Sequence, residues 1–225
     1  MKKSILSIIL FTFVIILTGC ASTYSSNDVL NILNERYPND SFTILSEEKI
    51  MISTNVNNTN QTEGTKWHIK SNITDLDFYA QDYMGDSTWS TQNTLKDNYF
   101  DVYYMDFIQN LNDYRIKVET HVVDEPYGIT SISGTYLYFS DYNYSKSAIA
   151  DAANSLSQKI KSDSKLMNLL PTYFWINIYD GNTCIASLSL NDSSNKNQIV
   201  EKLTNELEKL KDPYYNYTPT GTIKE

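Results

Sequence analysis

The chain has 225 residues, of which 41% are hydrophobic and 20% are charged. This ordinary globular balance fits one large domain or two small ones and allows a sizeable core. The 18 basic and 27 acidic residues give a net charge of −9, which argues against nucleic acid as a partner because nucleic-acid binding needs basic patches.

The first twenty residues have the pattern of a bacterial export signal. Residues 1–4 (MKKS) are basic, and the apolar run Ile5–Leu17 is too short for a bilayer core, which needs about 20 apolar residues in a helix. The run ends at Leu17-Thr18-Gly19-Cys20, an aliphatic residue followed by a small residue, Gly and Cys. This tetrapeptide resembles the lipobox of bacterial lipoprotein precursors.

The resemblance implies a lipid anchor. It implies diacylglyceryl transfer to the Cys20 thiol, cleavage after Gly19, and a mature lipoprotein held on the extracytoplasmic face of the cell membrane. Two acyl chains hold stably where one binds only marginally, so the apolar run is dispensable after export. The alternatives are an ordinary secretory peptide and an uncleaved anchor helix, in both of which Cys20 is incidental.

The charge of the mature chain bears on how it meets the membrane. Cleavage removes two of the 18 basic residues, and the 16 that remain against 27 acidic residues give −11. Anionic lipid repels such a domain. The tether that we expect over residues 20–26 spans about 20 Å when extended, so the domain is expected near the membrane without adhering to it.

Four segments have the periodicity of amphipathic helices. They are about Asn27–Tyr37, Leu95–Asn112, Lys146–Ser162 and Asn195–Lys211. Ser26 or Asn27 is the expected N-cap of the first, and Thr94 that of the second. The second carries an aromatic stripe from Phe100 to Leu111, long enough for a core helix.

Between the helices lie segments with the alternation of strands. They are Phe42–Thr54, Trp67–Ile73, Leu76–Tyr83, Ile116–Val122, Ile129–Tyr142, Tyr173–Tyr179 and Thr183–Leu190. Asp180-Gly181-Asn182 predicts a hairpin between the last two, because Gly can adopt the positive φ of a tight turn. The polar stretch Asn55–Thr65 is expected to be a mobile loop.

These elements predict an α+β fold with helices packed on a mostly antiparallel sheet. The expected domain covers residues 27–212, with a possible sub-boundary near 85–94, and residues 213–225 form a flexible tail. Two strands follow each of two successive helices, which suggests tandem helix-strand-strand units. Cys184 alternates with Ala186 and Leu188 and is expected in the core, because a lipidated Cys20 would leave it no disulfide partner. The alternative is a reactive or metal-binding thiol.

Nucleophilic and metal-dependent chemistry find little support in the sequence. His68 and His121 both lie on the polar phase of a strand, and no GxSxG motif occurs. His121 could join Asp124 and Glu125 in a metal site, but Asp124 has the opposite strand parity and the spacing fits no zinc motif.

Other site chemistries find equally little support. The run Asp192–Asn195 fails the EF-hand pattern and is explained by helix capping. The seven glycines form no phosphate loop, and the acidic pairs Glu47/Glu48 and Asp75/Asp77 are expected by chance in an acidic chain. We predict no enzyme, no cofactor and no metal.

Eighteen tyrosines are the more suggestive feature. They cluster at Tyr99, Tyr103 and Tyr104, at Tyr136, Tyr138, Tyr142 and Tyr144, and at Tyr214, Tyr215 and Tyr217. Such rings could form a platform for glycans or cationic peptides, while cross-strand packing explains Tyr136 and Tyr138 without a ligand. We predict non-catalytic interaction or assembly with an envelope protein; the alternative is capture of a cationic peptide, as lipoprotein immunity factors do, or of a cell-wall glycan.

Overall fold

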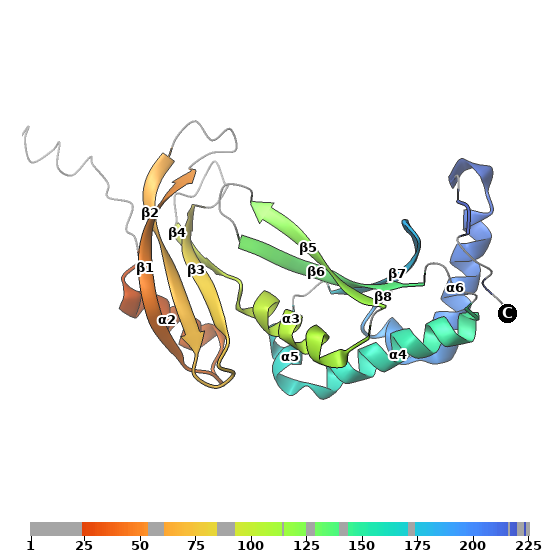
Figure 1. The fold of residues 1–225 in the computed structure, drawn as a ribbon, viewed down its shortest axis with the longest axis horizontal. Coiled ribbons are helices and arrows are strands. Elements are labelled where there is room, and N and C mark those ends of the chain that lie inside the picture. The colour runs from red at the N-terminus through yellow and green to blue at the C-terminus, as the bar shows by residue number, and fades with distance from the viewer. Residues whose placement is uncertain are drawn as a thin grey trace, which may run out of the picture. The chain divides into compact units, whose positions relative to one another are not determined.

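The computed structural model describes residues 24–53, 61–84, 93–113, 115–124, 129–139, 144–170, 174–215, 217–219 and 223 (Figure 1). The predicted signal peptide (1–19), Cys20 and the tether up to residue 23 lie outside these ranges, as do residues 85–92 of the predicted sub-boundary. Within the described ranges, no helix is long and apolar enough to cross a membrane.

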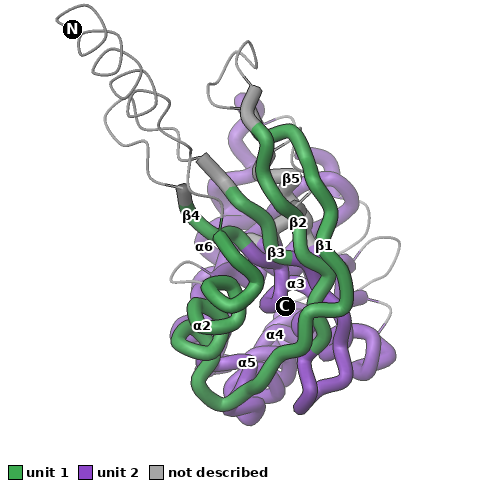
Figure 2. The backbone as a smooth tube through the Cα atoms, turned by 90° about the vertical axis from the view of Figure 1, so that its left-hand side faces the viewer, with its two compact units in different colours: residues 1–70, 80–96 green, residues 71–79, 97–225 purple. Residues whose placement is uncertain are grey.

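The chain divides into two compact units (Figure 2). Unit 1 comprises residues 1–70 and 80–96, and unit 2 comprises residues 71–79 and 97–225. The predicted domain 27–212 is therefore divided, and the later boundary follows shortly after the predicted range 85–94.

Two four-stranded sheets confirm the predicted α+β fold. Their strand orders are β1-β2-β3-β4 and β5-β6-β7-β8. In the second sheet the outer pairs are antiparallel and the central pair, β6 with β7, is parallel. A parallel pair needs a long crossover connection, which the helices between β6 and β7 supply.

Unit 1 begins with helix α2 (Ser26–Arg36), whose cap differs from the expected one. Ser25 is the N-cap, and it exchanges hydrogen bonds with Asp28 in a capping box. Neither Ser26 nor Asn27 takes this role. Val29 and Leu33 on one face of α2 are fully buried, so the predicted helix and its apolar face are confirmed.

Strands β1 (Phe42–Ser53), β2 (Gln61–Ser71), β3 (Asp77–Met84) and β4 (Asn93–Asp97) follow. The predicted loop Asn55–Thr65 is wrong at its end, because β2 already begins at Gln61; residues 54–60 lie outside the described ranges. Polar pairs support the strand here: the Lys49 Nζ atom lies 3.6 Å from Glu63 Oε1 and donates to Thr65 Oγ1 at 3.1 Å. Cross-strand polar pairs stabilise a ladder without apolar periodicity.

The predicted helix Leu95–Asn112 is too long at its start. Residues Leu95 to Asp97 belong to β4, and helix α3 spans Tyr99–Leu111. Leu95 is buried and precedes Tyr99 by four residues, so it continues the helical spacing although its backbone is extended. The N-cap is Asn98 rather than Thr94, and its side chain accepts a hydrogen bond from the Tyr79 amide instead of capping the helix.

Unit 2 packs its helices against one face of its sheet (Figure 1). After α3 come β5 (Ile116–Asp124), β6 (Ile129–Tyr138), α4 (Lys146–Ser162), α5 (Ser164–Leu169), β7 (Trp175–Asp180), β8 (Thr183–Ser189) and α6 (Lys196–Leu210), with short 3₁₀ turns at Asp192–Ser194 and Pro213–Tyr215. The predicted bounds of α4 are confirmed, and α5 was not predicted. The helix-strand-strand succession occurs twice, with α5 added in the second, but duplication itself stays a prediction.

One core joins these helices to the sheet. Its buried members on α4 are Ile149, Ala150, Ala153, Leu156 and Ile160, and on the strands they include Leu137, Ile176, Ile178, Ile185 and Leu188. The aromatic stripe of α3 packs against the same core, as its spacing predicts. The β7–β8 hairpin is also confirmed: Asp180 pairs with Thr183, and Gly181 has a φ of 58°.

The segment after α6 contacts the core at Tyr217. Its ring is partly buried against the core of unit 2, and its hydroxyl donates to Asp180 Oδ2 at 2.7 Å. The flexible tail over residues 213–225 stays a prediction, and Tyr217 is the residue of this segment whose hydroxyl bonds to a strand of the sheet.

Gly134 of β6 provides a test of how closely β6 and β7 approach. A Cβ atom there would lie 2.9 Å from the backbone oxygen of Trp175, which cannot turn away. Gly134→Ala is therefore expected to lower the free energy of unfolding by about 1–3 kcal/mol, measured by urea denaturation. Gly64→Ala is the control, because its Cβ would meet the movable side chain of Ile52 at 3.1 Å; equal losses would contradict the explanation.

Candidate functional site

A groove runs along the exposed side of α3, entirely within unit 2. Its volume is about 320 Å³, at the lower end of the range of small-ligand sites. The lining residues are Leu76, Asn98, Asp101, Val102, Met105, Asp106, Gln109 and Ile132. Five of them follow one another along α3 at helical spacing, so this helix forms one wall of the groove.

Asp101 is the buried polar group of this groove. Its side chain is 7% exposed, and Oδ1 accepts a hydrogen bond of 2.7 Å from the backbone amide of Ile132. A register irregularity interrupts the β5–β6 ladder between Gly134 and Ile132, and β7 pairs with β6 only from Gly134 onward. Asp101 therefore satisfies an amide at a place where the sheet is irregular.

Burial raises the pKa of Asp101 to about 6, with a further contribution from the negative charge of Asp97 and an opposing one from the Ile132 amide. Burial acts most strongly because a charged carboxylate loses its hydration there. The second oxygen, Oδ2, receives no hydrogen bond from any residue in the described part of the chain. Since Asp101 lines the groove, Oδ2 is the carboxylate oxygen that remains available to a ligand.

This pKa shift predicts a pH dependence of stability. The pKa is higher in the folded chain than the usual 3.8, so Asp101 contributes most stability below about pH 4, and that contribution is lost as the pH rises through about 6. The loss amounts to about 2–3 kcal/mol at most. Asp101→Asn is expected to remove this loss, since an amide oxygen can still accept from Ile132.

Urea denaturation of wild type and Asp101→Asn across this pH range measures the effect. As the pH rises, the free energy of unfolding of wild type should fall relative to that of Asp101→Asn. Parallel pH profiles would contradict the assignment.

The rest of the groove is apolar or uncharged except for one carboxylate. Leu76, Val102, Met105 and Ile132 supply apolar surface, and Met105 is 36% exposed. Asp106 is exposed and accepts from Asn110 Nδ2 at 3.2 Å. None of the described lining residues is basic, so both of the groove's charges are negative.

A second surface lies on the face of the sheet opposite the helices. Because Leu137 and Ile178 point into the core, their alternating neighbours Tyr136, Tyr138 and Tyr179 point to the other side. The three ring centroids lie 4.5 to 5.8 Å apart, which confirms the predicted cross-strand packing. We call Tyr136, Tyr138, Tyr179 and the adjacent Trp175 the aromatic face.

One lysine side chain of the same chain contacts the aromatic face. The Lys117 ammonium lies 4.6 Å from the centroid of the Tyr138 ring, within the range of a cation–π interaction. Elsewhere in unit 2, Lys165 lies 5.2 Å from Tyr99 and 5.3 Å from Tyr103. The tyrosines of this unit thus accept ammonium groups.

Cys184 also lies on this side of the sheet, and its predicted burial is wrong. Tyr179 pairs with Cys184 whereas Ile178 pairs with Ala186, so Ile185 is an extra residue in β8. Such a bulge shifts the alternation by one residue. Ile185 therefore takes the core position, and Cys184 is exposed and free of a disulfide.

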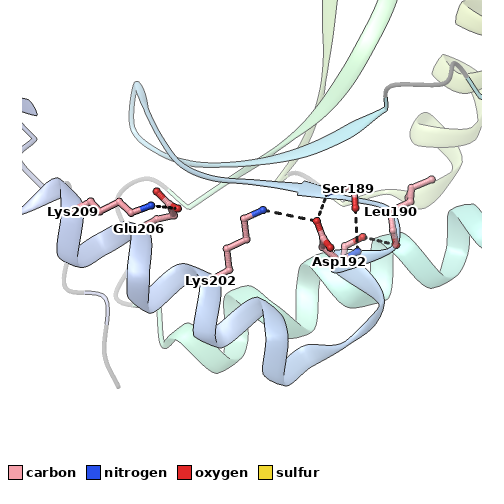
Figure 3. Close-up of polar contacts among 7 residues, drawn as sticks. Ser189, Leu190, Asp192, Lys202, Glu206 and Lys209 are labelled. Atoms are coloured by element: carbon pink, nitrogen blue, oxygen red, sulfur yellow. Dashed lines mark hydrogen bonds and ion pairs between the residues drawn. The ribbon is translucent and has the colours of Figure 1, made fainter.

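The polar flank of α6 forms an open depression of about 550 Å³, and both of its lysines are paired with carboxylates (Figure 3). Lys209 contacts Glu206 at 2.8 Å, and Lys202 lies 3.9 Å from Asp192. Surface pairs of this kind are typical of a solvated helix face. The run Asp192–Asn195 is confirmed as a capping segment, because Asn195 Oδ1 accepts from the amides of Asn197 and Gln198.

The structure does not assemble the remaining sequence candidates into a site. His68 is half-buried in β2, and the side chains of His121, Asp124 and Glu125 lie outside the described part. Glu47, Glu48, Asp75 and Asp77 are exposed. In the described ranges, no three residues among His, Cys, Asp and Glu are grouped to hold a metal ion. Of the other predicted tyrosines, Tyr99 and Tyr104 are buried and Tyr142 lies outside those ranges.

Sequence reasoning missed Asp101, although a signal was present. Asp101 shares its side of α3 with Tyr104 and Ile108, three and seven residues on, and both are buried. A carboxylate in such an apolar row is unusual and marks a candidate site.

The fold and the two surfaces define an α+β protein with an acidic groove and an aromatic sheet face. Comparison of the chain with family models, curated proteins and solved structures gave no match. The function is therefore argued from the residues of this chain.

Proposed function

We propose that the chain is a lipid-anchored protein of the extracytoplasmic face of the cell membrane that binds an envelope partner without catalysing a reaction. The lipobox resemblance at Leu17-Thr18-Gly19-Cys20 supports the location. The aromatic face supports the binding role, because exposed aromatic rings are enriched at interfaces.

The observation that carries the binding role is the exposure of Trp175. This side chain is 40% exposed on β7, on the same side of the sheet as the three packed tyrosines. A large exposed aromatic side chain of this kind is a typical interface anchor. Trp175 therefore keeps a large part of its surface open to solvent in the folded chain.

Photo-crosslinking in cells tests this role. A benzophenone side chain replaces Trp175 in one variant and Met167 in another; Met167 is also 40% exposed but lies on α5. A discrete adduct with an envelope protein is expected from position 175 only. No adduct at position 175, or the same adducts from both positions, would contradict the proposal.

The second candidate function is capture of a cationic peptide. Lys117 over Tyr138 and Lys165 between two rings favour it, together with the acidic balance of the chain. A salt-sensitive affinity for oligolysine is expected in that case, since charge attraction is screened by salt. Salt-insensitive retention on purified peptidoglycan would point to a glycan instead.

A further inference from the structure

We infer that the groove along α3 is a binding site for a lysine side chain of a peptide partner, with Asp101 receiving the ammonium group. This inference rests on the proposed binding role in its cationic-peptide form and names the site. It uses the groove alone and does not depend on the aromatic face.

The composition of the groove fits an alkylammonium group. Val102, Met105 and Ile132 offer apolar surface to a methylene stem, as lysine stems cover apolar surface while the charged end seeks a polar partner. Asp101 is only 7% exposed, and its Oδ2 atom is available to the ammonium group of the lysine. Asp106 adds a second negative charge at the edge.

The hydrogen bond to Ile132 favours lysine over arginine. A guanidinium group binds a carboxylate best through two parallel hydrogen bonds to both oxygens. Oδ1 of Asp101 already accepts from the Ile132 amide at 2.7 Å, so one oxygen is engaged. A single ammonium donor on Oδ2 suits this geometry better than a two-pronged donor.

Two acidic residues of the described part of the chain, Asp97 and Asp106, lie near Asp101. Asp97, at the end of β4, raises the pKa of Asp101 by charge repulsion. Asp106 lies five residues further along α3 and lines the same groove. A bound ammonium therefore relieves repulsion among carboxylates in a poorly hydrated place, where charge pairs are strong. Binding should weaken as the pH falls below about 6, because the protonated carboxyl loses its charge.

Fluorescence anisotropy with a fluorescein-labelled oligolysine peptide and the mature protein tests the inference. Asp101→Asn is expected to weaken binding about tenfold or more and to abolish its pH dependence. Glu201→Gln, which removes the same charge from an exposed position on α6, should have little effect. Equal losses in both variants would overturn the site in favour of diffuse charge attraction.

A second pair of variants keeps the test valid if Asp101→Asn is unstable. Met105→Lys places a competing ammonium at the groove, whereas Met167→Lys makes the same change at a similarly exposed residue on α5. Only the first is expected to weaken oligolysine binding beyond the general charge effect.

The assignment to lysine is tested with an oligoarginine peptide. Asp101→Asn should weaken the binding of oligoarginine less than that of oligolysine, and an equal loss would overturn the assignment to lysine.

The remaining outcomes separate this inference from the function on which it rests. Oligolysine binding that is unchanged in Asp101→Asn and Met105→Lys overturns the groove and leaves peptide capture intact. Absence of any oligolysine binding overturns both.

Discussion

Cys20→Ser is expected to abolish lipid labelling of the protein completely. The resemblance of Leu17-Thr18-Gly19-Cys20 to a lipobox implies two acyl chains on this one sulfur atom, each contributing about 0.8 kcal/mol per buried CH₂. Serine lacks the thiol that accepts the diacylglyceryl group. Metabolic labelling with a palmitate analogue, followed by detergent phase partition, measures the effect.

Cys184→Ser is the matched control for this prediction. It removes the other cysteine of the chain, which is exposed and free, and should leave both label and membrane fraction unchanged. Labelling that survives in Cys20→Ser, or that disappears in Cys184→Ser, would refute the anchor.

Tyr104→Ala is expected to destabilise unit 2 by about 3–5 kcal/mol. The Tyr104 ring is fully buried and lies 5.2 Å from the Phe174 ring and 5.7 Å from that of Phe100, measured between centroids. Its hydroxyl shares a hydrogen bond with Thr135 of β6. Removal of the ring leaves a cavity between α3 and the sheet, which neighbouring rings cannot fill without moving.

A double-mutant cycle separates the ring from its hydroxyl. Tyr104→Phe is expected to cost about 1–2 kcal/mol because Thr135 keeps a buried hydroxyl without a partner, and adding Thr135→Val should recover part of that loss. Tyr214→Ala, at an 85% exposed position, should stay within about 0.5 kcal/mol of wild type. Urea denaturation monitored by circular dichroism provides the values, and a cost at Tyr104 no larger than at Tyr214 would contradict the described core.

Local patterns in the sequence predict most of the helices and strands. The bounds of α4 follow from its apolar spacing, and in the structure Ser145 caps the helix by accepting from the Ala148 amide. The β7–β8 turn follows from Gly181, whose positive φ few other residues adopt readily. Both signals lie within a few residues of the feature that they predict.

The wrong predictions concern residues whose structure is determined by contacts with distant parts of the chain. Cys184 is exposed because one extra residue in β8 changes its pairing with β7, and the start of α3 is displaced because Leu95 belongs to a strand. Asp101 finds its hydrogen-bond donor in the Ile132 amide, 31 residues away. A periodicity argument contains no information about such partners, so the groove emerges only from the folded chain.

The mass of the N-terminal peptide of the membrane-extracted protein tests the central claim most directly. We expect a chain that begins at Cys20 and carries a diacylglyceryl group on its sulfur. A chain that still begins at Met1 with an unmodified thiol, or a mature chain recovered free of lipid in the soluble fraction, would contradict it.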